Sequence, residues 1–109
     1  MKFQYPAKLI SVVDGDTVDL QVDLGFRMTI RDRFRLYGIN APEIRGHERA
    51  RGLAAKVFLT ELLADQDINL HTHKDRRGKY GRWLATLIVA KGNVNELLVA
   101  NNHAVYRNY

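Results

Sequence analysis

The sequence of 109 residues contains no cysteine, which excludes disulfide scaffolds, zinc–thiolate centres and cysteine nucleophiles. It also lacks any apolar run near the ~18 residues that a membrane-spanning helix needs. Met1 to Pro6 is polar and aromatic, and no apolar segment of a secretory signal follows. We therefore expect a protein without a membrane partner, cytoplasmic by default.

Several sequence motifs are absent as well. There is no glycine-rich phosphate loop, no nucleophile elbow and no His-Glu-x-x-His motif. Repeats, linkers and low-complexity stretches are also missing. With 46% hydrophobic and 27% charged residues, the composition is that of a soluble globular protein. We expect one domain, residues 1–109, with a single core.

The charge is unbalanced towards the basic side. Lysine and arginine number 17 against 12 acidic residues, for a formal net charge of +5. A positive field attracts phosphate and releases its counterions, so a nucleic acid is a natural partner for such a chain. Charge alone does not decide whether nucleic acid is the partner.

The first half of the chain has the two-residue period of strands. Ala7–Val13 is rich in branched apolar residues, Asp14-Gly15 is a hairpin turn signal, and Thr17–Asp23 alternates. A third strand is expected over Arg27–Leu36. Its apolar face consists of Met28, Ile30, Phe34 and Leu36, interrupted by Asp32, and its other face of Arg27, Thr29, Arg31, Arg33 and Arg35.

After Pro42 the apolar spacing changes to three and four, which predicts an amphipathic helix over His47–Ala64. We expect its buried stripe to be Ala50, Leu53, Ala54, Val57, Phe58 and Leu62. Further expected elements are a strand at Ile68–His73, a charged loop at Lys74–Gly81, a strand at Arg82–Val89, a turn at Lys91-Gly92-Asn93 and a helix at Val94–Ala100. The pair Asn101-Asn102 tolerates the left-handed end of that helix.

The resulting order, β-β-β-α-β-β-α, predicts an α+β protein that is mostly β with two helices. A five-stranded Greek-key barrel of OB type fits this order. A small open α+β sheet is the alternative. A Rossmann-like fold is disfavoured because the parallel βαβ pattern is missing.

Two acidic groups are candidates for chemistry. Asp14 and Asp16 flank Gly15, and residues two apart in extended chain point the same way, so the turn offers two carboxylates to a hard cation. The alternative is an ordinary Asp-Gly turn. Glu43 follows the stiff Pro42, which suits a general base beside an arginine-lined face. Alternatively, it is only an acid at the entry of a helix.

Basic and aromatic residues provide weaker candidates. The segment Lys79-Tyr80-Gly81-Arg82 offers a guanidinium fork to phosphate, or else forms a solvated hairpin tip. His71 and His73 stand two apart on one strand; we favour an exposed polar face over a metal site because no third ligand stands out. Trp83 is expected in the core.

Taken in order, these pieces resemble the staphylococcal nuclease (thermonuclease) family. No single motif decides this, but four in the same order cover almost the whole chain. The matching segments are Val13–Val18, Phe34–Glu43, Asp75 with Lys79-Tyr80-Gly81-Arg82, and Val94–Val99.

The resemblance implies an OB barrel and calcium-dependent hydrolysis of phosphodiester bonds in DNA and/or RNA. By position, Glu43 resembles the general base, and Arg35 and Arg82 resemble the two guanidinium groups that hold the phosphate. The calcium site implied in the same way consists of Asp16 as a direct ligand, Asp14 in an outer shell, Asn40 and the carbonyl of Ala41. The implied substrate contacts are Lys79, Tyr80 and, more loosely, Tyr106.

The sequence departs from the family at two points. Asn40 is neutral where an aspartate is common, which removes a negative charge from the calcium site and should lower its affinity. The family's third, C-terminal helix lies beyond Tyr109, so we expect a homodimer or a rearranged C-terminus to cover the surface it leaves. The alternative function is a non-catalytic OB-fold module that binds nucleic acid or protein, with a degenerate metal site.

Overall fold

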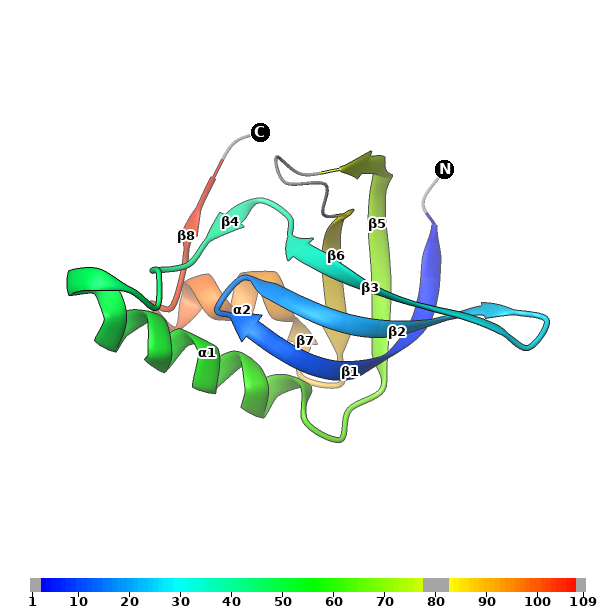
Figure 1. Cartoon of the computed structure of the whole chain (residues 1–109), viewed down its shortest axis with the longest axis horizontal. Coiled ribbons are helices and arrows are strands. Elements are labelled where there is room, and N and C mark those ends of the chain that lie inside the picture. Colours follow the sequence, from blue (N-terminus) through cyan, green and yellow to red (C-terminus); the bar gives the residue numbers. More distant parts are fainter. Residues whose placement is uncertain (1–2, 78–82, 108–109) are drawn as a thin grey trace.

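Three long strands precede the first helix, and two long strands and a second helix follow it (Figure 1). The structure is a computed structural model that describes residues 3–77 and 83–107. Its strands are β1 (Gln4–Asp14), β2 (Thr17–Gly25), β3 (Met28–Leu36), β4 (Ile39–Asn40), β5 (Ile68–Arg77), β6 (Trp83–Val89), β7 (Gly92–Asn93) and β8 (Val105–Tyr106). Its helices are the 3₁₀ turn η1 (Gly46–Glu48), α1 (Arg49–Leu63) and α2 (Val94–Ala100).

The long strands close into a five-stranded mixed barrel. The sheet order is β3-β2-β1-β5-β6-β7, and β3 also pairs with β6. That closing pair is parallel, from Phe34 opposite Trp83 to Leu36 opposite Ala85, whereas the other pairs are antiparallel. The predicted fold class, a five-stranded barrel with two helices, is therefore confirmed.

The first hairpin turns where the Asp-Gly signal predicts. Strands β1 and β2 pair in antiparallel register from Ala7 opposite Val22 to Asp14 opposite Thr17. The backbone N–H of Asp16 donates to Oδ1 of Asp14 at 3.1 Å, so the aspartate stabilises its own turn. The turn therefore brings Asp14 and Asp16 to one end of the barrel.

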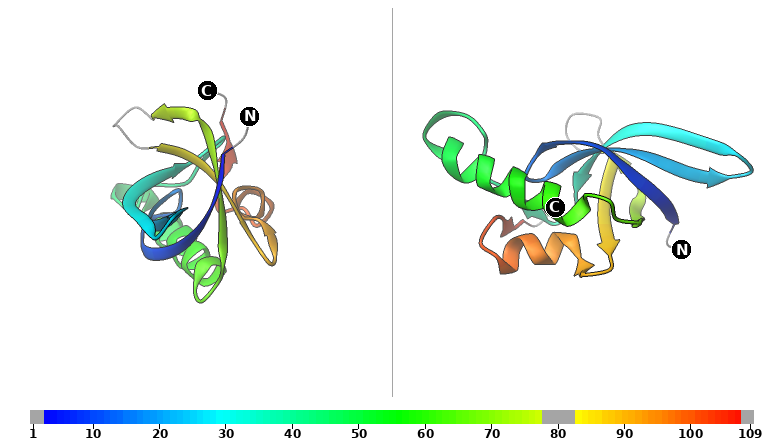
Figure 2. Two further views of the ribbon diagram at one scale, coloured as in Figure 1. Left: turned by 90° about the vertical axis from the view of Figure 1, so that its right-hand side faces the viewer. Right: turned by 90° about the horizontal axis from the view of Figure 1, so that it is seen from below.

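The β2–β3 hairpin projects well beyond the barrel (Figures 1 and 2). In β3 only Phe34, Arg35 and Leu36 are buried. Met28 and Ile30, on the apolar face of the predicted strand, are 59% and 42% exposed, so only the end of that face reaches the core.

Asp32 interrupts the apolar face of β3 because its carboxylate has a hydrogen-bond donor there. The indole N–H of Trp83 donates to Oδ2 of Asp32 at 2.9 Å, across the closing pair of strands. Trp83 itself is only partly buried, packed against the core, because its polar edge reaches this carboxylate.

The face of α1 that packs against the barrel matches the predicted stripe only in Leu62 and the partly buried Phe58. Its buried residues are Gly52, Ala55, Leu59, Leu62 and Leu63, whereas Leu53 and Val57 are 36% and 56% exposed. The prediction followed the largest apolar side chains. The helix instead buries three leucines together with Gly52 and Ala55, whose small size allows the closest approach of the chain segments.

Strand β5 is longer than predicted and continues through Arg77, so residues 74–77 are not part of a loop. His71 and His73 are half-buried rather than exposed. The ring of His73 stacks on Tyr37 with centroids 3.8 Å apart, and its Nε2 lies 2.7 Å from Oγ1 of Thr86. This histidine therefore packs within the fold.

Helix α2 spans the predicted Val94–Ala100. The side chain of Asn93 accepts from the backbone N–H of Glu96 and caps the helix, and Asn102 takes the left-handed conformation with φ of 63°. The chain then returns as β8, which pairs with β4. In the part of the chain that the structure describes, no helix is long and apolar enough to cross a membrane.

Candidate functional site

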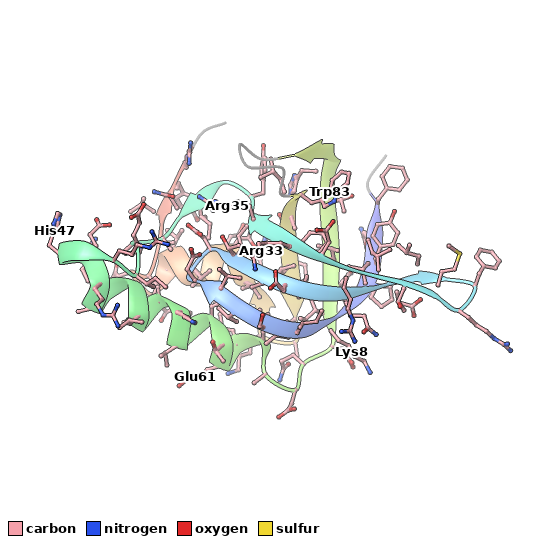
Figure 3. The ribbon with its side chains drawn as sticks, viewed as in Figure 1. Lys8, Arg33, Arg35, His47, Glu61 and Trp83 are labelled. Atoms are coloured by element: carbon pink, nitrogen blue, oxygen red, sulfur yellow. The ribbon has the colours of Figure 1, made fainter. Side chains whose placement is uncertain are left out.

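Three segments meet at one end of the barrel: the β1–β2 turn, the end of β3 with β4, and the first half of α1 (Figure 1). Figure 3 shows Arg33 and Arg35 following one another along β3, with Arg35 at the end towards β4. Arg35 and Asp16 are both buried, at 7% exposure each. Charged side chains are rarely this buried unless they are paired, so the pair defines the centre of the candidate site.

The carboxylate of Asp16 is held from three sides. Its Oδ2 accepts from the backbone N–H of Ala41 at 2.8 Å and lies 3.3 Å from Nη1 of Arg35. Its Oδ1 accepts from the hydroxyl of Thr17 at 3.1 Å. These contacts tie the β1–β2 turn to the segment after β4.

The guanidinium of Arg35 is equally constrained. Nη1 donates to the carbonyls of Leu36 and Ile39 at 3.2 and 3.0 Å, and Nη2 donates to Oδ1 of Asn40 at 2.9 Å. The turn between β3 and β4 therefore wraps around this side chain. A guanidinium fixed in this way is preorganised to meet an anion without further loss of side-chain entropy.

Burial raises the pKa of Asp16 to about 6 from its usual 3.8. The hydrogen bond with Asp14 acts in the same direction, while Arg35 and the backbone N–H of Ala41 oppose the rise. One arginine thus does not fully compensate the buried carboxylate. The site is short of positive charge, which is the electrostatic condition for holding a cation.

Glu43 lies two residues beyond Ala41, and its side chain is exposed. Its backbone N–H donates to Oε2 of Glu48 at 3.3 Å, and the next carbonyl, of Ile44, accepts from Nη1 of Arg49 at 3.3 Å. The start of α1 therefore holds the backbone of this segment and leaves the carboxylate facing solvent, where water is available.

Two glycines bring these segments close together; the sequence indicated Gly15 only as part of a turn, and we made no prediction for Gly52. A Cβ added to Gly15 would lie 2.7 Å from Cβ of Ala55 and 2.9 Å from Cβ of Ala41. Gly52 lies against the backbone of Glu43 and Ile44. The signal for Gly52 was present in the sequence, because an isolated glycine inside a helical pattern usually has a packing or functional reason.

The structure thus joins Asp14, Asp16, Arg35, Asn40 and Ala41 through direct contacts, with Glu43 next along the chain. The candidates Lys79, Tyr80 and Arg82 lie outside the described residues, so their convergence on the site stays a prediction. Tyr106 pairs with Ile39 in β8 and is 69% exposed. The expected homodimer also stays a prediction.

The donor set suits a hard cation. Asp14 and Asp16 offer carboxylate oxygens, Asn40 an amide oxygen and Ala41 a carbonyl, all of the type that calcium prefers. Among residues 3–77 and 83–107, no group of three or more His, Cys, Asp or Glu side chains is placed to hold a metal ion. The third side-chain donor here is the neutral Asn40, so the residues fit calcium with one negative charge fewer.

A groove of about 140 Å³ lies beside the site and is lined by Asn40, Ala41 and Pro42. The start of α1 and the chain after α2 line it further, with Glu48, Arg51 and residues 102–105. Its volume is below that of usual small-molecule pockets, so it does not provide a binding site for a whole nucleotide.

The fold and the site together define a small α+β barrel protein with a carboxylate–guanidinium centre at one end of the barrel. Residues 33–109 match the family model described as staphylococcal nuclease homologue. The chain is also 30% identical over 94 residues to the thermonuclease of Staphylococcus hyicus, covering 84% of this chain and 53% of that protein. The chain belongs to the staphylococcal nuclease homologue family, and it spans about half the length of the curated relative that it matches.

Proposed function

We propose that the chain is a calcium-dependent nuclease that hydrolyses phosphodiester bonds of DNA and/or RNA. The observation that carries this proposal is the buried Asp16–Arg35 pair, locked to Asn40 and Ala41 beside the exposed Glu43. A barrel needs no buried, poorly compensated carboxylate in order to fold, so this arrangement favours a ligand-binding role. The family and the name of the relative indicate a nuclease.

The proposed substrate-binding step uses the fixed guanidinium. Arg35 holds phosphate oxygens and stabilises the charge that accumulates on them in the transition state. Arg82 is assigned the second guanidinium role by its position in the family motif. Lys79, Tyr80 and Tyr106 are proposed substrate contacts on the same ground.

The proposed chemical step is a hydrolysis with Glu43 as general base. The carboxylate of Glu43 takes a proton from water, the water oxygen bonds to phosphorus, and one phosphorus–oxygen ester bond breaks. The leaving oxygen receives its proton from solvent. Asp16, Asn40 and the carbonyl of Ala41, with Asp14 behind them, would hold calcium, which supplies electrostatic stabilisation of the phosphate when bound.

The decisive experiment measures cleavage of single-stranded DNA with calcium, with EDTA, and by the Glu43→Gln variant. We expect cleavage that EDTA abolishes, and a loss of about 10²–10⁴-fold in rate for Glu43→Gln with nucleotide binding retained. The matched control is Glu61→Gln, because Glu61 lies on the side of α1 away from Arg35 (Figure 3). Equal rates for the two variants would refute the assignment of Glu43.

A second function, a non-catalytic module that binds nucleic acid, is favoured by one observation. Every oxygen of the Asp16 carboxylate already has a donor within the protein, and Asn40 is neutral. These contacts give both carboxylate oxygens a hydrogen-bond partner without a cation. Binding of single-stranded DNA that is unaffected by EDTA, with no cleavage under any condition, would support this function instead.

A further inference from the structure

The face of α1 towards the candidate site has almost no side chains. Gly52 and Ala55 stand three residues apart in the helix and therefore share this face, and both are buried. The turn that carries Asp14 and Asp16 rests on Ala55 through Gly15. One helix face therefore supports the carboxylate turn.

The same face also supports Glu43, at closer range. A Cβ added to Gly52 would overlap the carbonyl oxygen of Glu43 and would lie 2.5 Å from the Glu43 carbonyl carbon and 2.8 Å from the backbone nitrogen of Ile44. Cβ atoms do not approach backbone atoms this closely, and backbone cannot rotate aside as a flexible side chain can. Any residue other than glycine at position 52 must therefore displace the Glu43–Ile44 backbone or the helix.

Helix stability by itself favours a different residue. Glycine is a poor helix former compared with alanine, and Gly52 lies inside α1 rather than at a cap. It also does not adopt the left-handed conformation that requires glycine elsewhere. The contact with Glu43 is thus the feature of the fold that explains glycine here.

We propose that Gly52 is a positioning residue for Glu43. Its missing side chain lets the Glu43–Ile44 backbone rest directly on α1. The hydrogen bonds from Glu43 to Glu48 and from Arg49 to Ile44 hold the segment on either side of that contact. Because Ala55 supports the Asp16 turn one helical turn away, α1 sets the distance between the general base and the phosphate-binding centre.

This inference rests on the proposed function, in which Glu43 is the general base. A methyl group at position 52 moves the base but leaves the Asp16–Arg35 pair in place. Substrate binding should therefore survive while the chemical step suffers, since a displacement of about 1 Å can lower a rate by roughly 10²-fold. The expected signature is a lower kcat at nearly constant KM.

The test compares Gly52→Ala with Ala54→Gly, which lies on the exposed face of the same helix. We expect Gly52→Ala to lower kcat on single-stranded DNA by about 10–100-fold with KM within about twofold, and Ala54→Gly to keep the wild-type kcat. Amide NMR shifts should change at Glu43 and Ile44 in Gly52→Ala and not in the control.

A double variant separates positioning from general damage to the fold. In the Glu43→Gln background the base is already lost, so adding Gly52→Ala should cost no further rate. A further loss equal to that in the wild-type background would overturn the proposal, as would a Gly52→Ala enzyme with wild-type kcat. If the wild-type chain does not cleave at all, the proposed function fails; unchanged Glu43 and Ile44 amides in Gly52→Ala would then overturn the positioning role independently.

Discussion

Strands β2 and β3, together with the turn before β2, carry two aspartate–arginine pairs that differ in almost every physical respect. Asp19 and Arg33 make two hydrogen bonds, of 2.8 and 3.2 Å, with side chains 25% and 51% exposed. Asp16 and Arg35 approach to 3.3 Å, with side chains about 10% exposed. The exposed pair has the better geometry, and the buried pair has the more constrained surroundings.

The two carboxyl groups respond in opposite directions. The hydrogen bond from Arg33 lowers the pKa of Asp19, whereas burial raises the pKa of Asp16 to about 6 in spite of Arg35. An arginine neighbour therefore does not decide the charge state; the loss of solvent does. The buried arrangement does not increase folding stability, so it is typical of a site that serves binding or catalysis.

The largest expected difference between the pairs concerns activity. Arg35→Ala removes a fixed guanidinium from the proposed phosphate site and should lower kcat/KM on single-stranded DNA by about 10²–10³-fold. Arg33→Ala removes the same group two residues away on β3 and should stay within about threefold of wild type, since its partner is the exposed Asp19. Cleavage assays at saturating calcium measure both, and similar losses would show that the buried pair has no special role.

The next effect concerns stability against pH. The pKa of Asp16 is higher in the folded than in the unfolded state. The contribution of its protonated carboxyl to folding stability is therefore present at pH 4 and is lost as the pH rises through about 6. Asp14 and Arg35 face the same carboxyl. We expect Asp16→Asn to have a free energy of unfolding about 2–3 kcal/mol higher than that of wild type at pH 7, measured by urea denaturation. This difference should vanish near pH 4. A variant less stable than wild type at pH 7 would mean that the ion pair outweighs the burial.

Local signals made some elements predictable from the sequence. Helix α2 matches its predicted span because Asn93 caps it and Asn102 ends it, and both signals lie in the residues that flank the helix directly. The predicted packing face of α1 was wrong at Ala50, Leu53, Ala54 and Val57, because Gly52 and Ala55 make the closest contact of the helix with the segments of the site. Gly52 and Ala55 carry no hydrophobic signal, although they define that contact.

Some features of the candidate site could likewise be predicted from the sequence, and others could not. The order of motifs named Asp16, Arg35, Asn40 and Glu43 as candidates, and the structure places them near one another. The burial of Asp16 and Arg35 could not be predicted, because it arises when the β3–β4 turn wraps around Arg35 and the backbone of Ala41 reaches Asp16, a residue 25 positions away. Long-range backbone contacts of this kind leave no periodic trace in a sequence.

A charge added next to the buried pair should sharpen the comparison. Asn40→Asp restores a carboxylate where Arg35 now donates to an amide oxygen, and it adds a charged oxygen to the proposed calcium site. We expect calcium to bind about tenfold more tightly in calorimetric titration, with the greatest gain in activity at limiting calcium. Asn69→Asp, on the exposed side of β5, adds the same charge as a control. Equal gains in both variants would indicate a general charge effect.

The smallest expected effect belongs to the exposed pair. A double-mutant cycle of Asp19→Ala and Arg33→Ala should give a coupling of about 0.2–1 kcal/mol in urea unfolding, and about 1 M salt should remove most of it. Because folding lowers the pKa of Asp19, the contribution of its carboxylate to folding stability should be lost as the pH falls. This pH dependence is opposite to that of Asp16. A coupling that resists salt would mean that the hairpin shields Asp19 more than its exposure indicates. The contrast between the two pairs would then depend on the Asp14 neighbour and the backbone of Ala41 rather than on solvent.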